Sequence, residues 1–142
     1  ELDWYMLQNP LNRGMHDFVG ELLKTYRKYP CLYEIDNDWL GFEWMNADDK
    51  DRSIYSFVRR TRDGRQHMLF VLNMTPVEYP NYKVGVPMNT KYKLLINSDE
   101  ERYGGAGHRV PKEIKARKGK CDNRNQYVVI PLPPLTGVVY LF

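Results

Sequence analysis

From Trp39 onward the sequence is a succession of short apolar or alternating runs, each of which ends in residues that favour turns. The first two runs, 41–46 and 53–60, are joined by an acidic stretch, 48–51, whose residues suit a solvated turn and not the inside of a sheet. In the second run, alternation predicts a two-faced strand with Ile54, Ser56 and Val58 on one side. Closely spaced short strands of this kind are typical of an antiparallel sandwich or barrel.

Further runs predict five more strands, at 68–74, 82–86, 91–96, 126–132 and 137–142. The first of these is almost continuously apolar, which favours a central, buried position in a sheet. Pro76 and Pro80 are expected to interrupt the stretch before the next strand. Residues 97–125, which are rich in glycine and lysine, predict one long loop.

In the residues before these strands, the spacing of apolar side chains changes to that of a helix. Apolar side chains recur at three- and four-residue steps between Met15 and Lys28, and form one stripe of Phe18, Val19, Leu22, Leu23 and Tyr26. Residues 9–14 contain Asn, Pro and Gly and predict a loop, while Pro30 ends the helix. The sequence therefore predicts a mainly β chain that is preceded by one amphipathic helix of about fifteen residues.

Length and charge narrow the class of protein. The 142 residues suffice for one ordinary domain, and a net charge of +3 does not by itself imply a nucleic-acid partner. No run is long enough to span a membrane, and we expect no membrane partner. The first residue is Glu1, which suggests an excised or processed piece, and Cys31 and Cys121 fit two reduced thiols in a cytoplasmic protein.

Residue patterns for common catalytic chemistry are missing from the sequence. Seven carboxylates, most of them in turns or beside charges, show no pairing across a cleft: Asp3, Asp36, Asp38, Glu43, Asp48, Asp49 and Asp51. The serines have no nucleophile elbow, and the histidines and cysteines have no metal-ligand spacing. The sequence therefore predicts no catalytic residue, metal or cofactor within the chain.

Two features of the sequence, a basic run and the many aromatic residues, could serve to bind a polymer. The run 109–124 carries seven lysines and arginines and could bind a polyanion, but it lacks the interleaved aromatic residues typical of nucleic-acid binders, so we expect no nucleic-acid partner. Aromatic residues are numerous, and flat rings on a surface can pack against sugars. Trp39 and Tyr103, which are flanked by turn residues, are the best candidates for exposed rings, whereas Trp44 is expected in the core.

Short sequence motifs along the whole chain resemble one known family. In chain order they are Glu1-Leu2-Asp3-Trp4, Leu32-Tyr33-Glu34-Ile35-Asp36, Gly41-Phe42-Glu43-Trp44, Phe57-Val58-Arg59-Arg60, Leu72-Asn73-Met74-Thr75-Pro76-Val77, Asn97-Ser98-Asp99, Tyr103-Gly104-Gly105 and Leu132-Pro133-Pro134-Leu135. Together they resemble the C-terminal region of the bacterial 1,4-α-glucan branching enzymes, of the α-amylase superfamily. The basic residues 112–120 are not part of that pattern.

The resemblance implies a domain plan and a function. Residues 1–35 would be the end of a catalytic (β/α)₈ barrel, including its last helix, and residues 36–142 a C-terminal β-sandwich. The parent enzyme would transfer α-1,4-glucan segments to form α-1,6 branches in glycogen, with its catalytic carboxylates outside this chain, so the chain alone is expected to be inactive. The resemblance also places Trp4 near the glucan cleft, which makes Trp4, Trp39 and Tyr103 the candidates for glucan contact.

Two alternatives to the branching-enzyme domain remain open, a stand-alone carbohydrate-binding module and a nucleic-acid binder that uses residues 109–124. The branching-enzyme reading also implies that the apolar stripe of the helix packs between the barrel and the sandwich. Without the barrel, part of that stripe is expected to form an exposed apolar patch.

Overall fold

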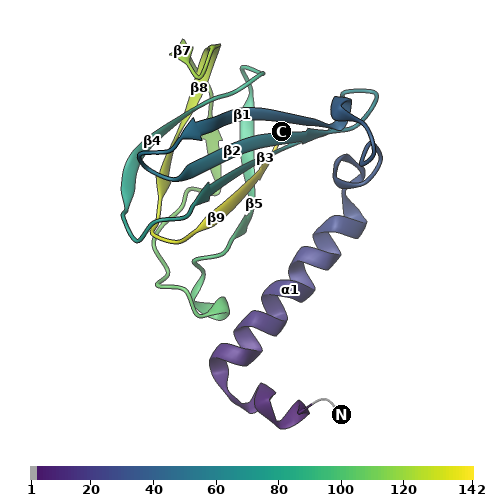
Figure 1. Ribbon diagram of the computed structural model, residues 1–142, viewed down its shortest axis with the longest axis vertical. Coiled ribbons are helices and arrows are strands. Elements are labelled where there is room, and N and C mark those ends of the chain that lie inside the picture. The colour runs from purple at the N-terminus through teal and green to yellow at the C-terminus, as the bar shows by residue number, and fades with distance from the viewer. Residues whose placement is uncertain (1–2) are drawn as a thin grey trace.

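The computed structural model describes residues 3–142, and Glu1 and Leu2 of the first motif lie outside the described residues. A short 3₁₀ helix, η1 (Trp4–Gln8), leads into the helix α1 (Pro10–Lys28), and η2 (Pro30–Leu32) and η3 (Trp39–Gly41) connect it to the strands (Figure 1). The strands are β1 (Phe42–Asp49), β2 (Ile54–Arg60), β3 (His67–Asn73), β4 (Tyr79–Gly85), β5 (Lys91–Asn97), β6 (Glu113–Lys115), β7 (Arg117–Cys121), β8 (Arg124–Leu132) and β9 (Gly137–Leu141). A further 3₁₀ helix, η4 (Glu101–Tyr103), lies between β5 and β6.

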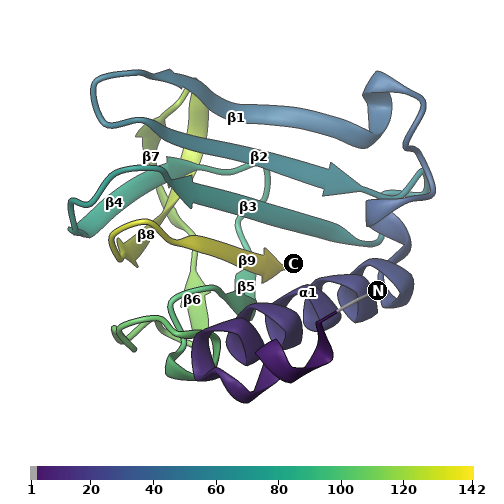
Figure 2. The same ribbon diagram turned by 60° about the horizontal axis from the view of Figure 1, so that its bottom comes forward.

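The strands form two antiparallel sheets, as the sequence predicts. The larger sheet has the order β1-β2-β3-β9-β5-β6, and the smaller has the order β4-β8-β7. Strand β3 lies inside the larger sheet between β2 and β9, which confirms the central position predicted from its apolar run. Figure 2 shows α1 running beside the larger sheet, so the molecule is a β-sandwich with one flanking helix.

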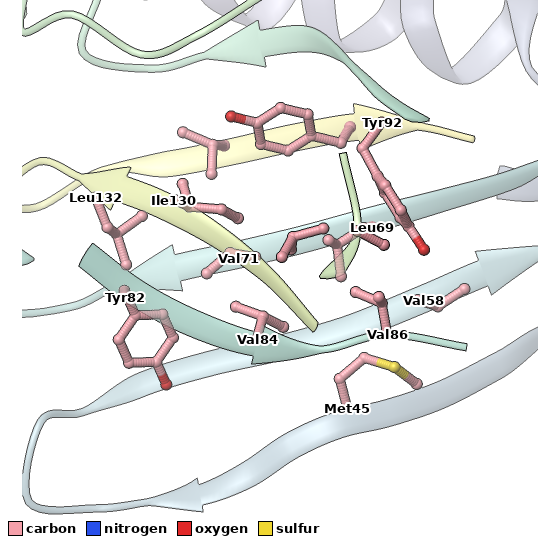
Figure 3. Packing of buried hydrophobic residues seen from close by; sticks show 14 of the residues in the cluster. Met45, Val58, Leu69, Val71, Tyr82, Val84, Val86, Tyr92, Ile130 and Leu132 are labelled. Carbon is pink, nitrogen blue, oxygen red and sulfur yellow. The ribbon is translucent and has the colours of Figure 1, made fainter. Parts of the chain in front are cut away.

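The main core fills the space between the two sheets. Ile54 and Val58 of β2 point into it, which confirms the alternation predicted for that strand, and Leu69 and Val71 of β3 lie next to them. Across from them lie Val84 of β4 and the alternate apolar residues of β8 (Figure 3). Burial of these aliphatic side chains supplies the main force that holds the sheets together.

A second, smaller core forms on the other face of the larger sheet. Cys31, Met68, Ile96 and Val139 are buried there, and Phe18 of α1 packs against them. The flanking helix predicted from the sequence is therefore attached to the outer face of the larger sheet, and only part of its apolar stripe is used.

The helix begins five residues earlier than the apolar period predicts. Asn9 caps its first turn by accepting a hydrogen bond from the backbone N–H of Leu11, at 2.9 Å, and Pro10 occupies the first helical position. Residues that read as a loop in the sequence are thus a helix start, because proline is favoured where the N–H has no helical partner.

Three further expectations about the strands are wrong. The predicted loop 97–125 contains β6 and β7, whose lysines leave their apolar pattern too weak to recognise. Pro80 lies inside β4, an edge strand, where a missing N–H can be tolerated. Asp48 and Asp49 belong to the edge strand β1, whose pairing is irregular there, so that the acidic turn itself is confined to the residues that follow.

Candidate functional site

An aromatic cluster covers the outer face of the larger sheet at its β1 end. The ring of Phe57 stacks on Phe70 with centroids 4.7 Å apart, and Phe42 and Trp44 pack against Phe57 at 5.1 and 5.7 Å. The Trp44 side chain is nonetheless 50% exposed, so its expected core position is wrong. The reason is that β1 is an edge strand and α1 does not reach across to cover it.

An apolar groove separates this cluster from the C-terminal half of α1. Its volume is about 520 Å³, and it is lined by Leu22, Leu23 and Tyr26 of the helix and by Phe42, Phe57 and Phe70 of the sheet. Arg59 also borders the groove; its guanidinium donates to the carbonyl of Leu32 at 3.1 Å and to Asp36 at 2.9 Å. These contacts anchor the connection between α1 and β1 at the edge of the groove.

Exposed apolar side chains continue from the groove along α1. Leu11, Met15 and Leu23 are each more than half exposed, and Val19 and Tyr26 are 44% exposed. The outer apolar face is defined as this stripe together with the groove and the aromatic cluster. Single exposed apolar residues are ordinary, but a continuous area of this kind marks an interaction surface.

Trp39 is the most exposed of the three glucan-contact candidates. Its side chain is 82% exposed and lies in η3, whose first turn is capped by Asp38 through a 2.9 Å bond from the backbone N–H of Leu40. Among residues 3–142 its ring has no aromatic or cationic partner. The ring is therefore free to pack against a ligand or another protein surface.

Tyr103 is held against the helix. Its ring meets Phe18 edge-on at 5.0 Å, Arg102 lies over it at 4.4 Å, and its backbone approaches Gly14 so closely that a Cβ there would lie 2.9 Å from the Tyr103 carbonyl carbon. These contacts dock η4 onto α1 and leave less of the ring available than the sequence suggests.

Trp4 lies in η1 and is 67% exposed. It precedes α1, whereas Trp39 follows it, and a helix of 19 residues is roughly 28 Å long. Tyr103 packs near Gly14, toward the Trp4 end of the helix. The three candidates therefore do not form one site, because Trp39 follows the opposite end of α1 from the one near Trp4 and Tyr103.

The loop that carries Tyr103 is organised by Asp99, whose role no sequence pattern indicates. The buried Asp99 carboxylate accepts hydrogen bonds from the backbone N–H groups of Ala106 and His108, at 3.0 and 2.7 Å, and lies 2.8 Å from His108 Nδ1. Burial alone would raise the pKa of Asp99, but these hydrogen bonds hold the pKa below its ordinary value of 3.8. The Asn97-Ser98-Asp99 motif thus encodes a loop structure.

The acidic stretch and the basic run also make structural contacts. Asp49 accepts a 2.6 Å hydrogen bond from the Tyr82 hydroxyl and pairs with Arg52, which closes one end of the sandwich. At the other end Glu43 pairs with both Arg60 and Arg124 and so links the two sheets. Within residues 3–142 no three His, Cys, Asp or Glu side chains gather closely enough to hold a metal ion.

Both cysteines are expected to react slowly. Burial raises the pKa of the Cys31 thiol to about 11, and burial together with the neighbouring Asp122 raises that of Cys121 to about 11 as well. At pH 8 iodoacetamide should therefore alkylate the native chain much more slowly than the chain in urea, with Cys31 the slower, as followed by mass spectrometry. Rapid native labelling of Cys31 would contradict its placement in the second core.

These observations define a β-sandwich domain with an exposed apolar face on one side. None of the helices within residues 3–142 has the length and apolar character needed to cross a membrane. The family model described as alpha amylase, C-terminal all-beta domain, matches residues 44–142. The chain belongs to this family, which confirms the fold class expected from its sequence.

Curated relatives extend the similarity to the whole chain. A protein of Butyrivibrio fibrisolvens named 1,4-alpha-glucan branching enzyme GlgB is 56% identical over all 142 residues. Proteins of the same name from Geobacillus stearothermophilus and Bacillus subtilis are 39% and 36% identical over 94% of the chain. The chain spans only 21–22% of the length of these three relatives.

Proposed function

We propose that this chain is the C-terminal part of a 1,4-α-glucan branching enzyme, whose reaction forms α-1,6 branches in glycogen from transferred α-1,4-glucan segments. The observation that carries the proposal is the 56% identity to a branching enzyme over the entire chain. The α-glucan substrate, the catalytic barrel and the barrel origin of residues 1–35 all belong to this proposal.

The domain's role is to pack against the catalytic part of the longer polypeptide. The outer apolar face supports this role, because it leaves Leu11, Met15 and Leu23 in water, at a cost that burial against a partner surface removes. The relatives are more than four times as long as the chain, so the polypeptide has ample further sequence to cover this face. The reaction itself takes place elsewhere in that polypeptide.

The docking role predicts different effects in the isolated chain and in the longer enzyme. Met15→Lys and Leu23→Lys should leave the melting temperature of the isolated chain nearly unchanged, since both side chains are already exposed at 61% and 59%. In the longer enzyme the same changes should lower the melting temperature and branching activity, because a lysine charge would have to be buried. Branching is measured as the change in glucan–iodine absorbance.

Lys28→Ala is the matched control on the polar side of the same helix, since Lys28 is exposed and lies about 140° around the helix from Leu23, and it should leave both proteins unchanged. Equal effects of Leu23→Lys and Lys28→Ala in the longer enzyme would contradict docking through the outer apolar face. Branching by the purified 142-residue chain would contradict the proposal that its catalytic carboxylates lie elsewhere.

A carbohydrate-binding module is the second candidate function, and the free ring of Trp39 is the observation that favours it. This function predicts that amylopectin retards the isolated chain in affinity electrophoresis and that Trp39→Ala abolishes the retardation. Trp4 remains a glucan-contact candidate, and the same electrophoresis of a Trp4→Ala variant tests it. If amylopectin does not retard the isolated chain, the docking role stands alone.

The proposed cellular location is the cytoplasm. The two cysteines are free thiols, as expected for a reducing compartment.

A nucleic-acid partner is not proposed. Within the basic run, Arg124 forms an ion pair with Glu43. The exposed lysines of β7 have no tryptophan or phenylalanine next to them in the sequence that could stack on bases.

A further inference from the structure

A polar groove lies on the side of α1 that faces away from the outer apolar face. Its volume is about 370 Å³, and it joins two segments far apart in the sequence, the helix and η4. Seven residues line it: His16, Asp17, Gly20, Glu21, Lys24, Arg102 and Tyr103. Because successive helix residues are rotated by about 100°, these helix positions point away from Met15, Val19 and Leu22.

The side chains around the groove carry charges of both signs. Asp17 and Glu21 offer carboxylate oxygens, and Lys24 and Arg102 offer N–H donors. A strongly anionic ligand would meet the two carboxylates, and a cation would meet the ammonium and guanidinium groups. A neutral ligand rich in hydroxyl groups fits both sets, because each hydroxyl both donates and accepts hydrogen bonds.

Part of this hydrogen-bonding capacity is unused by the fold. Glu21 and Lys24 have no ion-pair partner among residues 3–142, although Glu21 is half-buried. The Tyr103 hydroxyl is buried and has no hydrogen-bond partner within the described residues. Buried polar groups are normally paired, so an unpaired one calls for an explanation such as a ligand or water.

The floor of the groove is open because position 20 has no side chain. A Cβ placed on Gly20 would have no atom within 4 Å. Glycine inside a helix is unfavourable compared with alanine, and no close contact here requires it. The space above Gly20 is therefore a property of the groove and is not demanded by packing.

We infer that the groove between α1 and η4 is a binding subsite for a neutral oligosaccharide, held through hydroxyl contacts with the side chains of Glu21 and Lys24, which are unpaired among the described residues. The choice of an α-1,4-glucan as that oligosaccharide rests on the proposed function. The subsite and the outer apolar face lie on different sides of α1, so covering the apolar face does not by itself fill the subsite. It is separate from Trp39, which lies beyond the other end of α1.

The test is a titration of the isotope-labelled 142-residue chain with maltoheptaose, followed by two-dimensional amide NMR. Amide shifts should concentrate at residues 16–24 and 102–103, and inorganic phosphate at the same concentration should not produce them. Gly20→Leu, whose Cβ would have no atom within 4 Å and whose side chain would occupy part of the groove, should weaken binding at least about fivefold. Gly20→Ala is the matched control, which should raise the melting temperature through its helix propensity and leave most of the binding intact.

Three outcomes would overturn the proposed subsite. They are amide shifts with maltoheptaose that are confined to the region of Trp39, equal maltoheptaose affinity of the Gly20→Leu and Gly20→Ala variants, and the same amide shifts when phosphate is added without sugar. Absence of any maltoheptaose shift would also overturn it. None of these results bears on the branching-enzyme proposal, which is tested separately by the branching activity of the longer enzyme, or on the docking role, which is tested by its Leu23→Lys variant.

Discussion

Replacing Asn73 with alanine is expected to lower the free energy of unfolding by about 3 kcal/mol, the largest effect of any polar substitution considered. The Asn73 side chain is buried and uses its whole hydrogen-bonding capacity. Its amide nitrogen donates to the carbonyls of Val77 and Pro133, both at 2.8 Å, and its oxygen accepts from the backbone and hydroxyl of Thr75 at 3.0 and 2.8 Å.

The loss follows from what alanine leaves behind. Two backbone carbonyls and the Thr75 N–H lose their partners next to the core, and each unpaired buried group costs roughly 1–3 kcal/mol. For a chain of this size the melting temperature should fall by about 10 °C, which circular dichroism can measure. Asn73 also ties the β3–β4 connection to the β8–β9 connection, so both should become more open to proteolysis.

Asn81→Ala is the matched control, since Asn81 is an exposed strand residue with no side-chain hydrogen bond among residues 3–142. It should change stability by less than about 0.5 kcal/mol. Asn73→Asp should be at least as damaging as Asn73→Ala, because a carboxylate would face two carbonyl oxygens. Unchanged melting of Asn73→Ala would show that this hydrogen-bond network contributes little to stability.

Asp99→Ala is expected to cost about 2 kcal/mol and to release the loop that docks on α1. The buried N–H groups of Ala106 and His108 would lose their acceptor, and Tyr103 would lose the loop that presses it onto Gly14 and Phe18. Hydrogen exchange should therefore accelerate in the first half of α1 as well as in residues 99–108.

The pH dependence of stability provides a second signature of Asp99. Because its pKa is lower in the folded chain than the ordinary value of 3.8, the unfolded chain binds the proton more tightly. Its contribution to stability is therefore fully present above about pH 5 and is lost as the pH falls through its folded pKa. The difference between wild type and Asp99→Ala should shrink over that range in urea titrations.

Glu100→Ala is the control, because Glu100 pairs only with Arg102 on the surface and should have a small effect at every pH. A stability difference for Asp99→Ala that does not change between pH 7 and pH 3 would contradict the assigned role of its carboxylate.

Local patterns were sufficient for the elements that have a clear periodicity. The alternation in β2, the apolar run of β3 and the helical stripe of α1 each appear in the structure as predicted. They are predictable because each depends on which face of one element is buried. β6 and β7 were missed because their charged residues face water on a sheet edge, where burial leaves little pattern.

The glucan-contact candidates likewise differ in whether the local sequence could predict their surroundings. Turn residues around Trp39 correctly suggested an exposed ring, since exposure at a loop tip is a local property. The contacts of Tyr103 with Phe18, Gly14 and Arg102 could not be read from its glycine-rich surroundings, because the first two of these partners lie about ninety residues away in the sequence. The role of Asp99 in the fold of its loop was missed for a related reason, since its partners follow it by seven and nine residues without a regular period.

The sequence by itself determined the β-sandwich, the amphipathic helix and, through its motifs, the family to which the chain belongs. Periodicity and turn chemistry are local, so they survive in the order of the residues alone. Only the tertiary structure decided that Trp44 is half exposed, that the outer apolar face is continuous, and that a polar groove lies between α1 and η4. Each of these depends on which distant segments meet, because exposure is what remains after all packing contacts have formed.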